Sequence, residues 1–152
     1  MANLGKWNLS GVGLTTVLST GLNSLTSGSM SAASSTYANQ TNLDIYVDLE
    51  VNLASFSPAT SPAPYVSIYI LESVDGSNFP AQSAADLRLT TTQLFCSVPI
   101  GSTATTAQRV AVRNLIIPPG AVQFLLDNQT GAALAASGST VKILPYNFNL
   151  NG

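Results

Sequence analysis

Between residues 42 and 53 the sequence reads Asn42-Leu-Asp-Ile-Tyr-Val-Asp-Leu-Glu-Val-Asn-Leu53, with an apolar side chain at every second position. The odd-numbered residues are Leu, Ile or Val, and Asn, Asp, Glu and Tyr stand between them. A period of two is typical of a β-strand that has one buried and one solvated face. We therefore expect one long strand here, buried on the side of the odd-numbered residues.

The same period continues along most of the chain. Further candidate strands are residues 65–70, 93–100, 108–116, 121–127 and 140–148, with short ones at 34–38 and 132–135. Segments rich in Pro, Gly and Asn separate them, and these residues favour turns or cannot join a ladder of hydrogen bonds. About eight short strands at this spacing predict an all-β fold, an antiparallel sandwich or barrel.

The first thirty residues have a different pattern. Apolar residues recur there at helical spacing, which predicts a short helix over about three turns, although Gly21 and several Thr and Ser residues weaken it. The residues concerned are Leu14, Val17, Leu18, Leu22 and Leu25. We expect residues 1–30 to form an arm or short helix and residues 31–152 to form the β-sandwich. The arm either packs over its own sandwich or docks on a neighbouring subunit, and Trp7, Leu14, Leu18 and Leu22 are the candidate contacts.

Composition excludes several functions. Only 12 of the 152 residues are charged, whereas 52 are Ser, Thr, Asn or Gln, and the chain has no histidine and one cysteine. A Ser-His-Asp triad, a Cys-His pair or a His-ligated zinc site cannot form within one chain. Five basic residues and a net charge of -2 leave too little positive surface for nucleic acid.

The sequence also argues against a membrane protein or a secreted precursor. It has no run of 18 apolar residues, and its N-terminus has no continuous apolar segment of the kind found in a signal peptide. We therefore expect a protein made in the cytoplasm, without a membrane partner. The Asn-Gln-Thr triplets at Asn39 and Asn128 match the glycosylation sequon, but without a secretion signal we give that interpretation little weight.

Few residues suggest chemistry, and each has a plainer explanation. Asp48 and Glu50 share a strand face, as a catalytic carboxylate pair could, but charges on a solvated face explain them better. Asp75 begins an Asp-Gly-Ser-Asn segment that resembles part of a calcium loop, although a tight turn accounts for it. Cys96 lies in an apolar strand and is expected to be a small core residue. We expect no enzyme, no metal and no cofactor.

Arginines and tyrosines are the remaining candidates for binding. Arg109 and Arg113 are four residues apart on one strand and point the same way, so they are either solvated or a contact patch for a partner's carboxylates. Tyr46, Tyr65 and Tyr69 occupy the expected outer faces of two strands, where tyrosines can contact sugars, proteins or a second subunit. Of these residues, we add Arg109, Arg113 and Tyr69 to the candidate residues for contact with a partner.

Four segments together are similar to a known family. They are residues 42–53, 65–80, 117–131 and 141–147. In this order they resemble jelly-roll capsid decoration (cement) proteins of tailed bacteriophages. The resemblance implies a jelly-roll sandwich of about eight strands that forms a trimer and clamps neighbouring major capsid protein subunits on the outer surface of the capsid. It carries no catalytic motif.

The resulting expectation is a non-enzymatic virion structural protein, located on the capsid exterior, whose partners are the major capsid protein and further copies of itself. Two alternatives stay open. One is a tail or neck accessory protein of the virion, and the other is a carbohydrate-binding β-sandwich module that uses its outward tyrosines.

Overall fold

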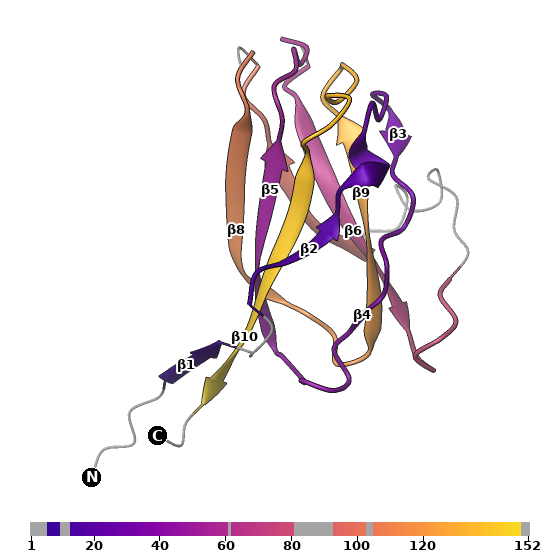
Figure 1. Ribbon diagram of the computed structural model, residues 1–152, viewed down its shortest axis with the longest axis vertical. Coiled ribbons are helices and arrows are strands. Elements are labelled where there is room, and N and C mark those ends of the chain that lie inside the picture. Colours follow the sequence, from indigo (N-terminus) through magenta and orange to yellow (C-terminus); the bar gives the residue numbers. More distant parts are fainter. Residues whose placement is uncertain (1–5, 10–12, 61, 81–92, 103–104, 150–152) are drawn as a thin grey trace.

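Two antiparallel sheets face each other in the computed structural model, which describes residues 6–9, 13–60, 62–80, 93–102 and 105–149 (Figure 1). Sheet A consists of β1 (Lys6–Leu9), β2 (Thr15–Leu18), β5 (Tyr46–Leu53), β8 (Gln108–Ile116) and β10 (Thr140–Asn149). Sheet B consists of β3 (Ser29–Met30), β4 (Tyr37–Ala38), β6 (Tyr65–Ser73), β7 (Leu94–Pro99) and β9 (Ala121–Gln129). No helix among these residues has the length and apolar character needed to cross a membrane.

The order of strand pairing defines the topology. Strands of the first half of the chain pair with strands of the second half in reverse order: β2 with β10, β3 and β4 with β9, β5 with β8, and β6 with β7. The chain is thus one long antiparallel ribbon, rolled up so that β5 also pairs with β10 and β6 with β9. Such a rolled ribbon is a jelly roll. The expected all-β, antiparallel, jelly-roll-like sandwich is confirmed.

The core lies between the sheets, and β5 supplies its clearest layer. Its buried residues are Val47, Leu49, Val51 and Leu53, each at most 1% exposed, and they alternate with partly exposed neighbours. The strand begins only at Tyr46, however. Leu43 is 57% exposed with a φ of 50°, and Ile45 is 48% exposed. The predicted inward face was therefore too long by two residues, because the chain turns at Leu43 before it joins the sheet.

The predicted helix of three turns near the N-terminus is wrong for the described residues. The segment forms strand β2 and then one turn of 3-10 helix at Thr20–Leu22. Leu18 and Leu22 are 4% and 0% exposed, and both belong to the main core. Pairing of β2 with β10 provides hydrogen bonds for a backbone rich in Thr, which has a weak helix propensity. Leu18 and Leu22 are four residues apart, as on one face of a helix. Both nevertheless face the core here, because Leu18 is an inward residue of β2 and Leu22 an inward residue of the turn that follows.

Two further expectations about strands need correction. Residues 132–135 form no strand; instead Leu134 and Ala135 exchange backbone hydrogen bonds with Leu25 and Ser24. Strand β6 was expected to turn its tyrosines outward, yet Tyr69 is only 6% exposed. Tyr69 packs with Leu71, Leu125, Phe79 and Met30 in a second, smaller cluster on the outer side of sheet B. Sheet B is therefore apolar on both faces over part of its length.

Both asparagines of the Asn-Gln-Thr triplets are fully buried and organise loops. Asn39 donates to the carbonyls of Asp44 and Pro118, each at 2.8 Å, and accepts from the Asp44 amide. Asn128 donates to the carbonyls of Leu25 and Ala132, and its Oδ1 accepts from the amide and hydroxyl of Thr130. A glycan could attach to neither side chain in this fold, because both amide hydrogens are used and no space is open to solvent.

Candidate binding face on sheet A

A shallow groove runs along the outer face of sheet A, over β10, β5 and β8. It consists of two adjoining hollows of about 460 and 380 Å³ that share Asp48, Arg113 and Leu144. Its other lining residues are Leu9, Leu14, Leu49, Glu50, Arg109, Ala111, Asn114 and Tyr146. We call this surface the charged groove. It combines two carboxylates, two guanidinium groups and an aliphatic floor.

A β-bulge builds the middle of the charged groove. Val47 pairs with Leu115 and Leu49 with Val112, so the single residue Asp48 lies opposite two residues, Arg113 and Asn114. Asn114 takes a left-handed conformation, with a φ of 59°, as bulges often require. Residues 113 and 114 are consequently both exposed, where simple alternation would have turned one of them inward.

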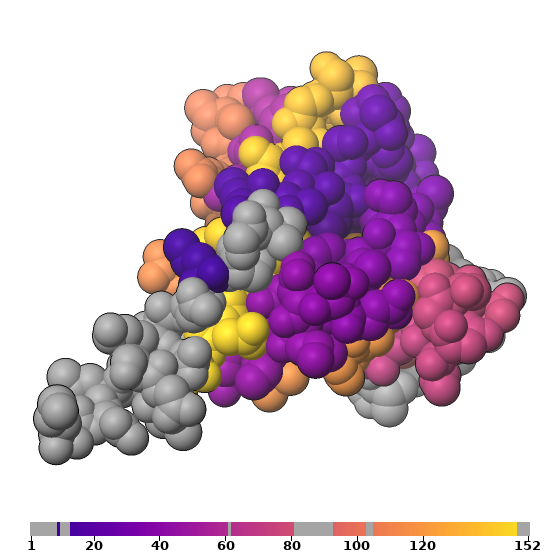
Figure 2. All heavy atoms as spheres, turned by 60° about the horizontal axis from the view of Figure 1, so that its bottom comes forward, coloured from indigo at the N-terminus to yellow at the C-terminus, as the bar shows by residue number. Residues whose placement is uncertain are grey.

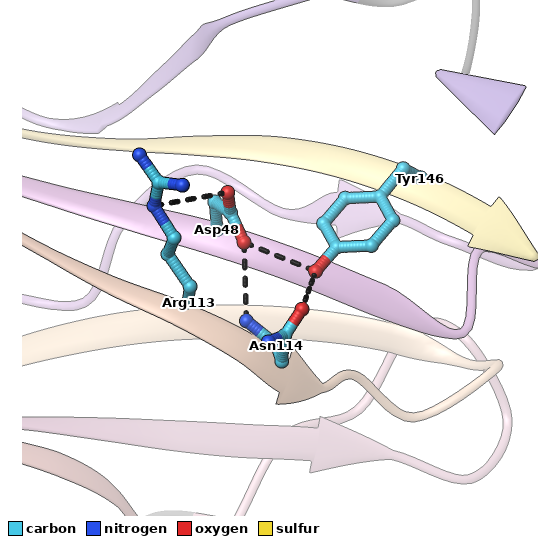
Figure 3. Close-up of polar contacts among 4 residues, drawn as sticks. All are labelled: Asp48, Arg113, Asn114 and Tyr146. Atoms are coloured by element: carbon cyan, nitrogen blue, oxygen red, sulfur yellow. Dashed lines mark hydrogen bonds and ion pairs between the residues drawn. The ribbon is translucent and has the colours of Figure 1, made fainter. Parts of the chain in front are cut away.

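The bulge brings four polar side chains together (Figure 3). Asp48 Oδ1 accepts a hydrogen bond from the Asn114 amide at 3.1 Å and lies 3.0 Å from the Tyr146 hydroxyl. The same hydroxyl lies 2.6 Å from Asn114 Oδ1, and Arg113 Nε lies 4.0 Å from Asp48 Oδ2. Burial first, and then the hydrogen bond and negative charge of Asp48, raise the pKa of the Tyr146 phenol. Tyr146 is therefore a neutral hydrogen-bond donor at physiological pH.

Glu50 and Arg109 form the second charged pair, one step further along β5 and β8. Arg109 Nε donates to Glu50 Oε2 at 2.7 Å, and its Nη2 bonds the same oxygen. The arginine side chain is 70% exposed, whereas that of Glu50 is 14% exposed. The carboxylates of the groove therefore lie beneath the guanidinium groups. Each of these carboxylates pairs with an arginine of β8, whereas the sequence predicted only charges on a solvated strand face.

The expected turn at residues 75–78 is confirmed. Asp75 accepts hydrogen bonds from the backbone amides of Ser77 and Asn78, from the Asn78 side chain and from the Ser73 hydroxyl. These bonds, the Asn78 amide first, hold the pKa of the Asp75 carboxyl well below its usual range. Gly76 supplies the positive φ of 79° that the turn requires. Within the described residues, no group of three or more potential ligands could hold a metal ion.

Three of the seven predicted contact residues meet in the charged groove. Leu14, which is 50% exposed, lines the same hollow as Arg109 and Arg113. The two arginines point the same way, as expected, and each has a carboxylate of its own chain as a partner.

The other four predicted contact residues lie elsewhere. Leu18 and Leu22 face the core of their own chain, which is the packing alternative for this segment, and Tyr69 is buried on sheet B. A partner could reach these three side chains only if the fold opened. For Trp7 the structure describes only the backbone, which pairs with Phe148 between β1 and β10.

Sequence reasoning missed Asn114 and Tyr146 as members of the groove. A signal for Asn114 existed, because the apolar positions of β8 run Val110, Val112 and then Leu115, a slip of one residue that marks a bulge. No comparable signal marks Tyr146. It reaches Asp48 only because β10 lies beside β5, a pairing between residues nearly 100 positions apart.

Cys96 behaves as the expected small core residue and leads to a testable prediction. It packs against the main core, and burial raises the pKa of its thiol to about 11. The thiolate fraction at pH 7 is then about a hundredfold lower than for an ordinary cysteine. Ellman's reagent should therefore label the native protein about a hundredfold more slowly than the urea-unfolded protein. Equal rates in the two states would contradict the placement of this partly buried thiol against the core. Cys96 is the only cysteine, so the signal is unambiguous.

Comparison with known proteins gives distant likenesses in fold. No family model and no curated protein matches the sequence. Among solved structures, the CBM35 of Abf62 from Cellvibrio japonicus is 12% identical, with a TM-score of 0.46, and the alignment covers 98% of this chain and 99% of that one. The C-terminal CBM6 of LamC from Zobellia galactanivorans is also 12% identical, with a TM-score of 0.43 and coverages of 93% and 99%. These values assign neither a family nor a function.

Proposed function

We propose that this protein is a non-enzymatic virion structural protein that decorates a capsid, binding as a homotrimer to the outer surface of the major capsid protein. The observation that carries the proposal is a ribbon formed by β1 and the end of β10, which projects from the sandwich (Figure 1). A two-stranded ribbon is marginally stable in water when it packs against nothing. A protein that presents one is suited to bind a surface rather than to transform a small molecule.

Exposed apolar side chains gather at the same end of the molecule. Leu9 and Phe148, on the ribbon, are 62% and 42% exposed, and Leu43, Ile45 and Ile116 at its root are between 48% and 69% exposed. Register connects them: Leu9 pairs with Tyr146, Tyr146 with Tyr46, and Tyr46 with Ile116. Figure 2 turns this end of the molecule toward the viewer. Concentrated apolar surface of this kind marks sites of protein association.

The root of the ribbon is held in place by a buried polar cluster. Asn147 of β10 accepts from the Ile45 amide at 2.8 Å and donates to Asp44, which is 2% exposed. Tyr37 donates to the same carboxylate at 3.2 Å, and burial, with the Asp44 charge next, raises its pKa to about 12. The ribbon therefore leaves the sandwich in a defined direction. A preorganised contact loses less chain entropy on binding than a loose one.

Low surface charge is a second support for the proposal. The chain carries 8% charged residues, and uncharged polar groups cost less to desolvate in an interface than charges do. Contacts of this kind are individually weak. Repetition by symmetry in a trimer and over a capsid lattice makes them strong through multivalency.

Binding to capsids that lack the protein tests the proposal, with Leu9→Glu as the informative variant. A charge on the ribbon should weaken co-sedimentation about tenfold or more, as expected when a buried apolar contact is lost from an interface. Val74→Glu is the matched control, because Val74 is fully exposed on the β6 side of the molecule and should leave binding unchanged. Equal binding by both variants would contradict a role for the ribbon.

Two further measurements separate the alternatives. Light scattering should give about 47 kDa, three times the 15.7 kDa of one chain, if the trimer exists in solution. Failure to bind capsids together with a positive glycan array would favour a carbohydrate-binding module. That alternative has lost part of its basis, because Tyr69 is buried and Tyr46 stacks on Tyr146 with ring centroids 5.7 Å apart.

A further inference from the structure

We propose that the charged groove on sheet A is the docking surface for an extended protein segment that carries two carboxylates four residues apart. The inference rests on the proposed function in one respect, since it takes the segment to belong to the capsid protein. Its physical basis is independent of that identity and lies in the charge and spacing of Arg109 and Arg113 and in the preorganisation of Arg109.

Charge is distributed unevenly over the chain. Arg109 and Arg113 on β8 and Lys142 on β10 share the outer face of sheet A near the groove, although the net charge of the chain is -2. This part of the face also holds Asp48 and Glu50, so its described side chains carry one net positive charge. The exposed charge is more positive still, because the two guanidinium side chains are 70% and 77% exposed and their carboxylate partners 14% and 28%. The complementary partner is acidic.

Glu50, which lies beneath Arg109, holds this arginine in a binding-competent position. Glu50 uses two donors of Arg109 through a single oxygen, and a guanidinium has five donors. Donors remain to take a second carboxylate from outside, in the bidentate geometry that arginine favours. Because the side chain is already held by Glu50, less rotamer entropy is lost when the partner binds.

Spacing defines the occupant more closely. Arg109 and Arg113 are four residues apart on β8, and Arg113 is the first residue of the bulge, so their Cα atoms are about 13 Å apart. An extended partner strand that follows β8 presents carboxylates at the same interval from positions i and i+4. Between the arginines the side chains of Ala111 and Leu144 form the floor, with Leu14 beside them. The side chain at i+2 of the partner should therefore be apolar.

A charge-swapped protein, Glu50→Arg with Arg109→Glu, tests this inference. The swap keeps the ion pair and the net charge but exchanges which sign is exposed. The probe is the synthetic peptide Val-Thr-Glu-Thr-Val-Thr-Glu-Thr-Val, which has Glu at positions 3 and 7 and Val between them at position 5, and its counterpart has Lys at positions 3 and 7. We expect the wild type to bind the Glu peptide, to bind the Lys peptide at least tenfold more weakly, and to lose the Glu peptide with added salt. The swapped protein should lose this preference, because it exposes Glu at position 109 while Arg113 still exposes a positive charge.

Other outcomes overturn the inference. If the wild type binds the two peptides equally, or does not bind the Glu peptide at millimolar concentration, the groove does not select carboxylates. If the swapped protein fails to fold by circular dichroism, Arg113→Gln replaces it, because Arg113 is 77% exposed and its ion pair is long. This variant should bind the Glu peptide about fivefold more weakly, and unchanged binding would count against the inference.

Failure of the inference can be distinguished from failure of the proposed function. If wild-type and swapped proteins co-sediment equally with capsids, the protein decorates capsids through another surface. If the wild type selects the Glu peptide but binds no capsid, the groove is a docking site and the capsid is not its partner.

Discussion

Replacing the buried Asn128 with Asp is expected to lower the free energy of unfolding by about 3–5 kcal/mol. The Asn128 amide nitrogen donates to the carbonyls of Leu25 and Ala132 at 2.8 and 2.9 Å, and the residue is 0% exposed. A carboxylate has nearly the same shape but no hydrogen to donate. The substitution would leave two carbonyl oxygens facing a third acceptor, away from water, and each unsatisfied buried group costs about 1–3 kcal/mol.

Urea denaturation at neutral pH measures this loss, and Asn23→Asp is the matched control. Asn23 lies two residues before Leu25, whose carbonyl Asn128 bonds, but the Asn23 side chain is exposed, so the control should change stability by less than about 0.5 kcal/mol. Equal losses in the two variants would show that the Asn128 hydrogen bonds do not determine the loop. The comparison isolates the buried amide, because both variants introduce the same negative charge.

Replacing Phe124 with Ala is expected to cost a similar amount, about 3–5 kcal/mol. Phe124 is 0% exposed in the middle of β9, and its ring meets that of Phe95 edge to face, with centroids 6.0 Å apart. Truncation removes apolar surface from the core and leaves a cavity between the two sheets that the strands cannot close. In a domain of this size, 1 kcal/mol corresponds to a shift of about 2–4 °C in Tm. The variant should therefore melt at least about 6 °C below the wild type.

Phe148→Ala provides the control of the same residue type. Phe148 is 42% exposed on the projecting ribbon, and its truncation should cost about 1 kcal/mol or less. Similar losses of Tm in the two phenylalanine variants would contradict the assignment of the core to the space between the sheets. Capsid binding provides a second test: Phe148→Ala should remain folded but bind capsids more weakly than the wild type.

Local patterns in the sequence predicted much of the fold. Alternation in β5 identified the inward residues Val47 to Leu53, and alternation in β8 placed Arg109 and Arg113 on the outer face. Turn chemistry identified Asp75 as the start of a tight turn. These predictions succeed because side-chain direction in a strand and backbone geometry in a turn depend on a few adjacent residues.

Local patterns failed where distant segments decide the structure. The leucines from Leu14 to Leu25 have helical spacing, but β10 offers β2 a complete set of backbone partners, and pairing prevails over a weak propensity. Tyr69 looked solvated because its own strand alternates. The apolar cluster that covers it includes Leu125 of β9 and Phe79, neither of which the β6 pattern can indicate.

The amino-acid sequence by itself determined that this protein is an antiparallel β-sandwich or barrel without histidine chemistry, with one thiol packed on the core and with two arginines on one outer face. The tertiary structure alone decided that these arginines pair with Glu50 and Asp48, and that Tyr146 and Asn114 lie beside them. It also decided that Asn39 and Asn128 are buried and hydrogen-bond the backbone of neighbouring loops. The physical reason is the separation along the chain of the residues that interact. Strand periodicity is a property of neighbours along the chain, whereas these contacts join residues up to about 100 positions apart. The order in which the strands pair in the jelly roll determines which of these residues meet.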